Sequence, residues 1–117
     1  MPDGTERIVL LPRYTTFVGP GPFYTKPRNV RAYSNGYVTA WRSVGRGGSL
    51  AVTFVVERSS DLATWAVSST LTPGASAEVT THDEDTREWL RLKVTLSGTG
   101  DLSASTWAVG DFVLRDA

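Results

Sequence analysis

The sequence predicts an all-β protein, a two-sheet sandwich of jelly-roll type with about eight short antiparallel strands. The first observation is a period-two alternation in residues 87–97, where aliphatic side chains occupy every second position. Such alternation is typical of a strand with one buried face, whereas a helix would spread these side chains around its axis. Residues 49–58 alternate in the same way, and Gly, Pro, Asn and Ser recur between short apolar segments along the whole chain. The aliphatic side chains of the strongest strand, which we expect to be central, are Leu90, Leu92, Val94 and Leu96.

The composition excludes several classes of protein. A chain of 117 residues can bury the core of one domain without a metal or a disulfide. It contains no cysteine, which rules out disulfides, thiolate zinc sites and cysteine nucleophiles. No apolar run reaches the roughly 18 residues of a membrane helix, and the first residues lack the pattern of a signal peptide. We therefore expect synthesis in the cytoplasm, no membrane association and no cofactor.

The charges are balanced overall but unevenly distributed. The 12 basic and 12 acidic residues give a net charge of zero, which argues against nucleic acid as a partner. Residues 1–60 hold eight basic and three acidic residues, and residues 61–117 hold four and nine. Two interpretations stay open. The surface is polarised and registers neighbouring molecules, or the two halves interleave in the sheets and their charges mix.

The N-terminal segment is expected to be an extended arm or an edge segment over residues 1–27, with the sandwich domain formed by residues 28–117. Residues 6–11 and 14–18 are short β-rich pieces, ended by a proline and a glycine. Residues 19–27 contain three prolines and favour an extended surface segment that no regular element tolerates. Its aromatic side chains, Phe23 and Tyr24, either form a lid on the sandwich or contact a partner. On this interpretation the sandwich folds without the arm.

The next segment is expected to be a hairpin followed by a second strong strand. Asn35 and Gly36 are the residues of a tight turn between strands at 29–33 and 37–44, the second of which places Tyr37, Thr39 and Trp41 on one face. Residues 45–48, Gly-Arg-Gly-Gly, lack the Lys-Ser/Thr of a phosphate-binding loop and are interpreted as a hairpin connection. The strand that follows buries Leu50, Val52, Phe54 and Val56.

The remaining elements are predicted from their turns. Ser60 and Asp61 are expected to hydrogen-bond a turn, after which Trp65 fills the core. Residues 71–75 form another turn before a strand at 76–81. Residues 97–101 turn the chain into a last strand at 103–115, in which Gly110 marks a bulge or bend. The side chains expected to be buried from that last strand are Trp107 and Val109, with Phe112 and Leu114.

The residues capable of chemistry do not form a catalytic pattern. His82 is the single histidine and lies in the sequence His-Asp-Glu-Asp at 82–85. This cluster lacks the alternating spacing of a calcium loop, and we interpret it as a solvated acidic loop rather than a metal site. Glu57, Glu78 and Glu88 occupy polar positions of strands or loops, which is no arrangement for glycoside hydrolysis. The sequence therefore predicts a protein that is not an enzyme.

Two segments resemble small jelly-roll virion proteins of tailed bacteriophages. Those proteins have a strand leading into Ser-x-Asp-Gly-x-x-Trp, which is similar to residues 55–65 with Leu62 in place of the glycine. They also have a later aromatic-x-Arg-(Val/Leu) strand ending in Ser-Gly, which is similar to residues 87–98. The resemblance implies a capsid decoration (cement) protein at the capsid surface of the virion. It also implies a trimer or dimer that contacts the major capsid protein and neighbouring copies of itself.

The alternative function is a carbohydrate-binding module, or a tail or neck adhesin or connector of a phage particle. Exposed aromatic rings on one face of a strand can stack on sugars, and Tyr37 and Trp41 would serve that purpose. Both interpretations work through exposed aromatic and cationic side chains. The candidate partner-binding residues are Phe23, Tyr24, Arg28, Tyr37, Trp41 and Arg46.

Overall fold

The protein is described by a computed structural model over residues 4–115, and every strand pairing in it is antiparallel. This confirms the predicted all-β class. Within the described residues, no helix has the length and apolar character that a membrane crossing needs. The eight strands are β1 (Thr5–Val18), β2 (Phe23–Tyr24), β3 (Arg28–Asn29), β4 (Tyr33–Arg42), β5 (Arg46–Ser59), β6 (Ala66–Leu71), β7 (Ala77–Asp83) and β8 (Trp89–Leu114).

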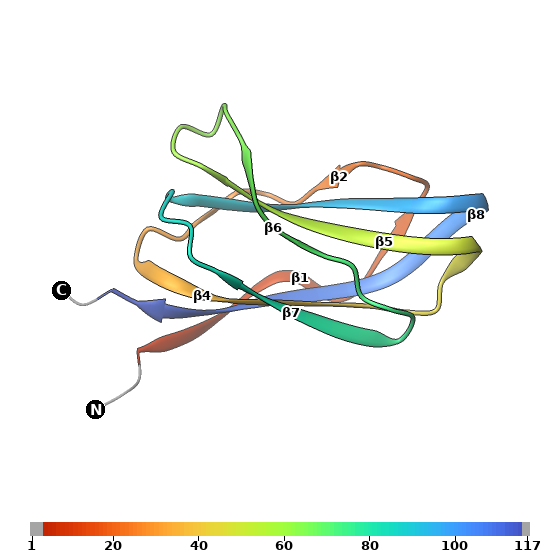
Figure 1. The fold of residues 1–117 in the computed structure, drawn as a ribbon, viewed down its shortest axis with the longest axis horizontal. Helices are drawn as coiled ribbons and strands as arrows, with labels where there is room; N and C mark the ends of the chain where they lie inside the picture. The colour runs from red at the N-terminus through yellow and green to blue at the C-terminus, as the bar shows by residue number, and fades with distance from the viewer. Residues whose placement is uncertain (1–3, 116–117) are drawn as a thin grey trace.

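Strand β8 belongs to both layers of the sandwich. Its first part, residues 89–97, pairs with β5, and its last part, residues 103–114, pairs with β1 and β4. Figure 1 shows β8 running along one layer, reversing direction at its labelled end and returning through the other layer. The reversal contains residues 97–101, where the sequence predicts a turn. The first sheet thus consists of β6, β5, residues 89–97 of β8, and β2 and β3; the second consists of β7, β4, residues 103–114 of β8, and β1.

The core lies between the two sheets. All four aliphatic side chains of the predicted central strand are buried, and so are Val52, Phe54 and Val56 from β5. The second sheet contributes Val38 and Ala40 from β4. This confirms the alternation on which the fold prediction was based.

The prediction for the last strand is right for Phe112, which is buried, and wrong for Trp107 and Val109, while Leu114 is half-buried. Trp107 and Val109 are only half-buried and lie on the outer face of the second sheet. The inward side chains are the even-numbered ones, which are mostly small: Leu102, Ala104, Thr106, Ala108 and Phe112. Both parities of this strand are apolar, so alternation alone does not distinguish them. Bulky side chains of the opposite sheet fill the core, and small residues fit between them.

Trp65 does not fill the core as predicted. It is half-buried and packs on the outside of the first sheet, where the Arg91 guanidinium lies 4.2 Å from its ring centroid. The same guanidinium lies 4.3 Å from the ring of Tyr24 and donates a 2.7 Å hydrogen bond to Glu57. The indole therefore covers a cation instead of aliphatic side chains.

The predicted hairpin at Asn35 and Gly36 is also wrong. Both residues lie inside β4, next to a bulge, and the turn is at residues 31–32, where the Tyr33 N–H donates to the Val30 carbonyl over 3.0 Å. A side chain on Gly36 would meet the ring of Phe112 at 2.5 Å. Gly110, where the sequence predicts a bulge, pairs without a register shift and lies under the same ring. The two glycines make room for Phe112.

The segment expected to be an arm is part of the sandwich over its described residues. β1 pairs with β8 from Thr5↔Val113 to Val18↔Ser103, and Leu10 and Leu11 are buried. The proline-rich segment that follows runs along the first part of β8: Leu96 N–H donates to the Pro20 carbonyl over 3.0 Å. Residues 5–18 are an edge strand because their apolar side chains complete the core.

The acidic loop is less solvated than predicted. Asp83 is fully buried and forms a 2.7 Å ion pair with Arg58, while Ser68 donates a 2.6 Å hydrogen bond to it. Arg87 pairs with Asp85, which lowers the pKa of that carboxyl through the hydrogen bond from the guanidinium. Glu84 remains exposed.

The two halves of the chain interleave, which favours the mixed-charge interpretation. Strand β8 from the second half lies between β5 and β4 from the first half. Ion pairs join the halves, for example Arg7 with Asp111 and Arg58 with Asp83. The opposite charges of the halves therefore neutralise one another across strands.

Candidate functional site

Two surfaces of the sandwich combine exposed apolar side chains with a hollow, and these are the candidate sites. The first is the outer face of the second sheet, which we name the tryptophan face after Trp41 and Trp107. The second is the end of the sandwich at which β8 reverses, formed by residues 18–20, 44–48 and 98–103, which we name the glycine-rich end. Across residues 4–115, no group of three or more His, Asp or Glu side chains is placed to hold a metal ion.

The tryptophan face is ordered into three rows that cross four strands. The strand register aligns the outward side chains of β8, β4 and β7 in each row and those of β1 in the first two rows, whereas Arg13 of β1 joins the third row through its contact with Trp107. Cross-strand neighbours on one face are close enough to interact, so each row behaves as a unit. The first row is Arg7, Asp111, Tyr37 and His82; the second is Val9, Val109, Thr39 and Thr80; the third is Arg13, Trp107, Trp41 and Glu78.

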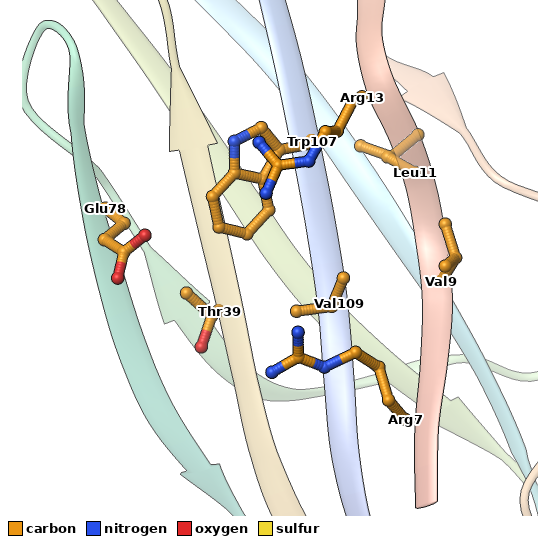
Figure 2. A pocket seen from close by; sticks show the side chains of 8 residues that line it. All are labelled: Arg7, Val9, Leu11, Arg13, Thr39, Glu78, Trp107 and Val109. Carbon is orange, nitrogen blue, oxygen red and sulfur yellow. The ribbon is translucent and has the colours of Figure 1, made fainter.

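The third row places two indoles between opposite charges. The rings of Trp41 and Trp107 are nearly parallel, with an interplanar angle of 10° and centroids 6.5 Å apart. The Arg13 guanidinium lies 5.0 Å from the centroid of Trp107. Figure 2 shows Arg13 over the indole on one side of the row and Glu78 on the other. No ion pair to either charged group occurs among the described residues.

A bulge in β1 presents Arg13 and Tyr14 to this face. The register of β1 against β8 shifts between Leu11 and Thr15, and the Thr15 hydroxyl donates a 2.7 Å hydrogen bond to the Pro12 carbonyl. Tyr14 has a φ of +64° and is 74% exposed. A bulky residue in the left-handed region is strained, and such strain persists where the surrounding structure imposes it.

A shallow hollow of about 430 Å³ lies between β1 and β4 on the same face. Val9, Val109 and Trp107 line it, and Figure 2 shows the two valines between Arg7 and Arg13, with Arg13 over the indole. Hydrogen bonds from Arg7 to Asp111, 2.8 Å at Nε, raise the pKa of the guanidinium above its ordinary value. The Asp111 carboxylate therefore balances the positive charge of Arg7.

The glycine-rich end contains a second hollow of about 630 Å³. Val18 and Arg46 flank it from either side of Ser103, with which both pair. Val18 is 73% exposed, and Val44, in the connection between β4 and β5, is 66% exposed. The predicted loop at residues 45–48 is the irregular start of β5, whose pairing with β8 shifts twice before Ala51.

The six candidate residues do not form one site. Tyr37 and Trp41 lie together on the tryptophan face, and Arg46 lies at the glycine-rich end. Phe23 stacks on Phe17, with centroids 4.9 Å apart, and packs against the core, as in the lid interpretation. The remaining two lie elsewhere on the surface: Tyr24 against Arg91, and Arg28 donating a 2.9 Å hydrogen bond to the Val9 carbonyl.

Several residues of the two surfaces were missed from the sequence. Trp107 was assigned to the core because the last strand is apolar on both parities. Val9 and Arg13 were placed in an arm, and Val18 and Val44 were read only as strand ends. The signal that could have found Trp107 is the run of small residues at 104, 106, 108 and 110, which fits a tightly packed inner face.

The comparisons with known proteins show the fold. No family model and no curated relative matches the sequence. The structure is similar to the PBSX exported protein XepA, with a TM-score of 0.59 and 11% identity over 96% of this chain and 38% of that one. It is also similar to a structure of infectious bursal disease virus, Gx strain, with a TM-score of 0.62 and 11% identity over 94% of this chain and 33% of that one.

A VP2 subviral particle of the same virus gives a TM-score of 0.60 and 12% identity over 94% of this chain and 32% of that one. This chain therefore spans about a third of the length of these three chains. At this level of identity the similarity is one of fold.

Proposed function

We propose that this chain is a structural protein of a bacteriophage particle, a capsid decoration protein that binds the lattice of the major capsid protein and stabilises the head. The observation that carries the proposal is the glycine-rich end, where exposed Val18 lines a hollow together with Arg46 and Asp101, and Val44 is exposed two residues before Arg46. An apolar centre with a charged rim is the usual composition of a protein contact.

The arrangement of the chain supports contact through this end. At the opposite end of the sandwich β1 begins and β8 ends, and there Thr5 pairs with Val113. The glycine-rich end is formed by the reversal within β8 (Figure 1), by the connection from β4 to β5 and by the last residues of β1. It can therefore abut a flat lattice.

The fold and the absence of a reactive arrangement are in keeping with this proposal. The neighbours in fold include proteins from virus particles and an exported protein of PBSX. His82 is engaged on the surface, with its ring 4.7 Å from that of Tyr37, and Glu57 pairs with Arg91 at 2.7 Å. A role that consists of burying surface needs none of these groups to react.

Co-sedimentation with capsids tests the proposal. The capsids come from the phage that encodes this chain and are prepared without it. We expect Val18→Asp and Val44→Asp to weaken binding about tenfold or more, because each places a charge in an apolar contact. Val67→Asp is the matched control, since Val67 is an equally exposed valine on β6. Full occupancy by both variants would overturn the assignment of this end.

The second candidate function is carbohydrate binding, favoured by the parallel indoles of Trp41 and Trp107. Two contacts argue against sugar binding. The Arg13 guanidinium lies over the ring of Trp107, and the ring of Tyr37 packs against His82, so both aromatic rings already have a partner within the chain. Glycan-array binding that disappears in Trp41→Ala would decide for this candidate. Binding to undecorated capsids without any glycan would decide for the first.

A further inference from the structure

We infer that the tryptophan face joins two copies of this chain across a two-fold axis. The inference goes beyond capsid binding and is independent of it, because association between copies is measured without capsids. It rests on the order of charges along the third row of the face, on the apolar side chains beside that row, and on the strained tyrosine at its edge.

The third row is complementary to itself. It reads cation, indole, indole, anion from Arg13 through Trp107 and Trp41 to Glu78. A two-fold axis that lies in the contact plane, parallel to the strands and between β4 and β8, reverses the order of a row in the second copy. Arg13 then faces Glu78 of the second copy, and Trp107 faces Trp41 of the second copy. A two-fold contact repeats each of these pairs, which gives two ion pairs around four indoles.

The charges of this row have no partner within the described chain, which is what makes a second copy the fitting occupant. An ion pair satisfies Arg7 through Asp111, and the His82 ring lies 3.4 Å from the Glu84 carboxylate, whereas Arg13 is stacked on an indole and Glu78 is exposed. Charges of opposite sign across an apolar contact set the orientation of the partners and oppose wrong pairings. A partner with a single sign of charge would leave one of the two groups unpaired.

The neighbouring side chains supply apolar surface for the contact. Val9 in the second row is 47% exposed, and Tyr37 in the first row is 53% exposed. Tyr14, held outward by the bulge, lies at the edge of the indole pair. Exposed aromatic side chains at the centre of a contact tend to carry much of its binding energy. Pairing of two such faces removes these side chains from water.

Charge reversal tests the inference with sedimentation velocity over a range of protein concentrations up to the millimolar range. The wild-type chain is expected to sediment as a dimer whose fraction rises with concentration. Arg13→Glu and Glu78→Arg, each alone, place like charges against each other twice and are expected to weaken association at least about tenfold. Arg31→Glu, at an exposed position away from this face, is the matched control and should associate as the wild type does.

Two further samples separate a lost contact from a damaged fold. The double variant Arg13→Glu/Glu78→Arg restores opposite charges and is expected to dimerise. An equimolar mixture of the two single variants is expected to form a heterodimer, because each then meets a complementary row. Circular dichroism of every variant shows whether it is folded. A monomeric wild type, or single variants that associate as tightly as the wild type, would overturn the inference, as would failure of both rescue samples.

Discussion

Arg58 and Asp83 form a buried ion pair that joins the two sheets, with 2.7 Å between Arg58 Nη1 and Asp83 Oδ2 and side-chain exposures of 4% and 0%. The pair is supported on both sides. Ser68 and the backbone of Asp85 donate hydrogen bonds to the carboxylate, and the guanidinium donates to the Arg87 carbonyl. Because every group in this network is satisfied, the loop between β7 and β8 is fixed against the first sheet.

Removing one member of this pair should be costly. We expect Asp83→Ala to lower the free energy of unfolding by about 3–5 kcal/mol, because it leaves the buried Arg58 cation uncompensated. The apolar double variant Arg58→Met/Asp83→Leu should recover most of that loss. Urea unfolding followed by circular dichroism measures all three proteins. A single variant as stable as the wild type would contradict the ion-pair description.

The core prediction concerns Leu92 at the centre of β8. Leu92→Ala should lower the free energy of unfolding by about 2–5 kcal/mol, since the side chain is fully buried between the sheets. Thr95→Ala, on the outer parity of the same strand, is the control and should change stability far less. Denaturant midpoints give the comparison. Equal effects of the two substitutions would mean that the inner and outer faces of β8 are misassigned.

These two sites differ in how far the sequence reveals them. The burial of Leu92 follows from alternation within one segment, where polar residues occupy the other parity. The pairing of Arg58 with Asp83 joins positions far apart in the chain, and no local pattern indicates it. The same holds for the tryptophan face. Tyr37 and Trp41 share a strand face and were predicted together, whereas Trp107 and Arg13 reach them only through strand register and a bulge.

Errors of the sequence interpretation occur where a residue type has two good environments. Trp65 was expected in the core because indoles are large and apolar, but an indole also stacks on a guanidinium, and Arg91 is adjacent. Gly36 follows an asparagine, a common turn pair, yet its lack of a side chain is used for the close approach of Phe112. Only the packed structure distinguishes these alternatives.

The turn after β5 offers a stabilising substitution. Leu62 has a φ of +64°, at the position where the resembling phage proteins have glycine. The turn itself is held by Asp61, whose carboxylate accepts hydrogen bonds from the N–H groups of Ala63 and Thr64 at 2.9 and 2.8 Å, and by the Ser59 hydroxyl. Leu62→Gly should therefore raise the free energy of unfolding by about 1 kcal/mol, because it relieves left-handed strain. Ala63→Gly, where φ is not positive, should lower it. The thermal midpoints of both variants are compared with that of the wild type. A lower midpoint in Leu62→Gly would contradict the turn geometry.

Stability should fall in acid partly through Asp85. Hydrogen bonds from Arg87 hold the pKa of Asp85 below its ordinary value in the folded state. A carboxyl with a lowered folded pKa contributes stability above its unfolded pKa, about 4, and loses that contribution as the pH falls through the folded value. Asp85→Asn should therefore reduce the fall of the thermal midpoint between neutral pH and about pH 2. Glu84→Gln removes an exposed charge next to it and serves as the control. An unchanged pH profile in Asp85→Asn would contradict the argument.

The last prediction concerns β1, the part of residues 1–27 that pairs with β8 along the edge of the second sheet. If residues 1–27 were an arm, their deletion would leave a folded sandwich. In the structure, β1 covers residues 103–113 of β8, buries Leu10 and Leu11, and stacks Phe17 on Phe23. Deletion would leave the last strand of the second sheet unpaired on one side and open the core at its edge. We therefore expect the chain of residues 28–117 to lack a cooperative unfolding transition and to aggregate.

A synthetic peptide of residues 1–27 provides the control for that deletion. Because the missing segment contributes β1, β2 and two buried leucines, adding it in trans should restore the strand spectrum by circular dichroism and a cooperative thermal transition. A peptide with Leu10→Asp and Leu11→Asp should fail to restore either, since a buried charge opposes docking. If the truncated chain unfolds cooperatively at the wild-type midpoint without any peptide, β1 is dispensable to the sandwich and the arm interpretation returns.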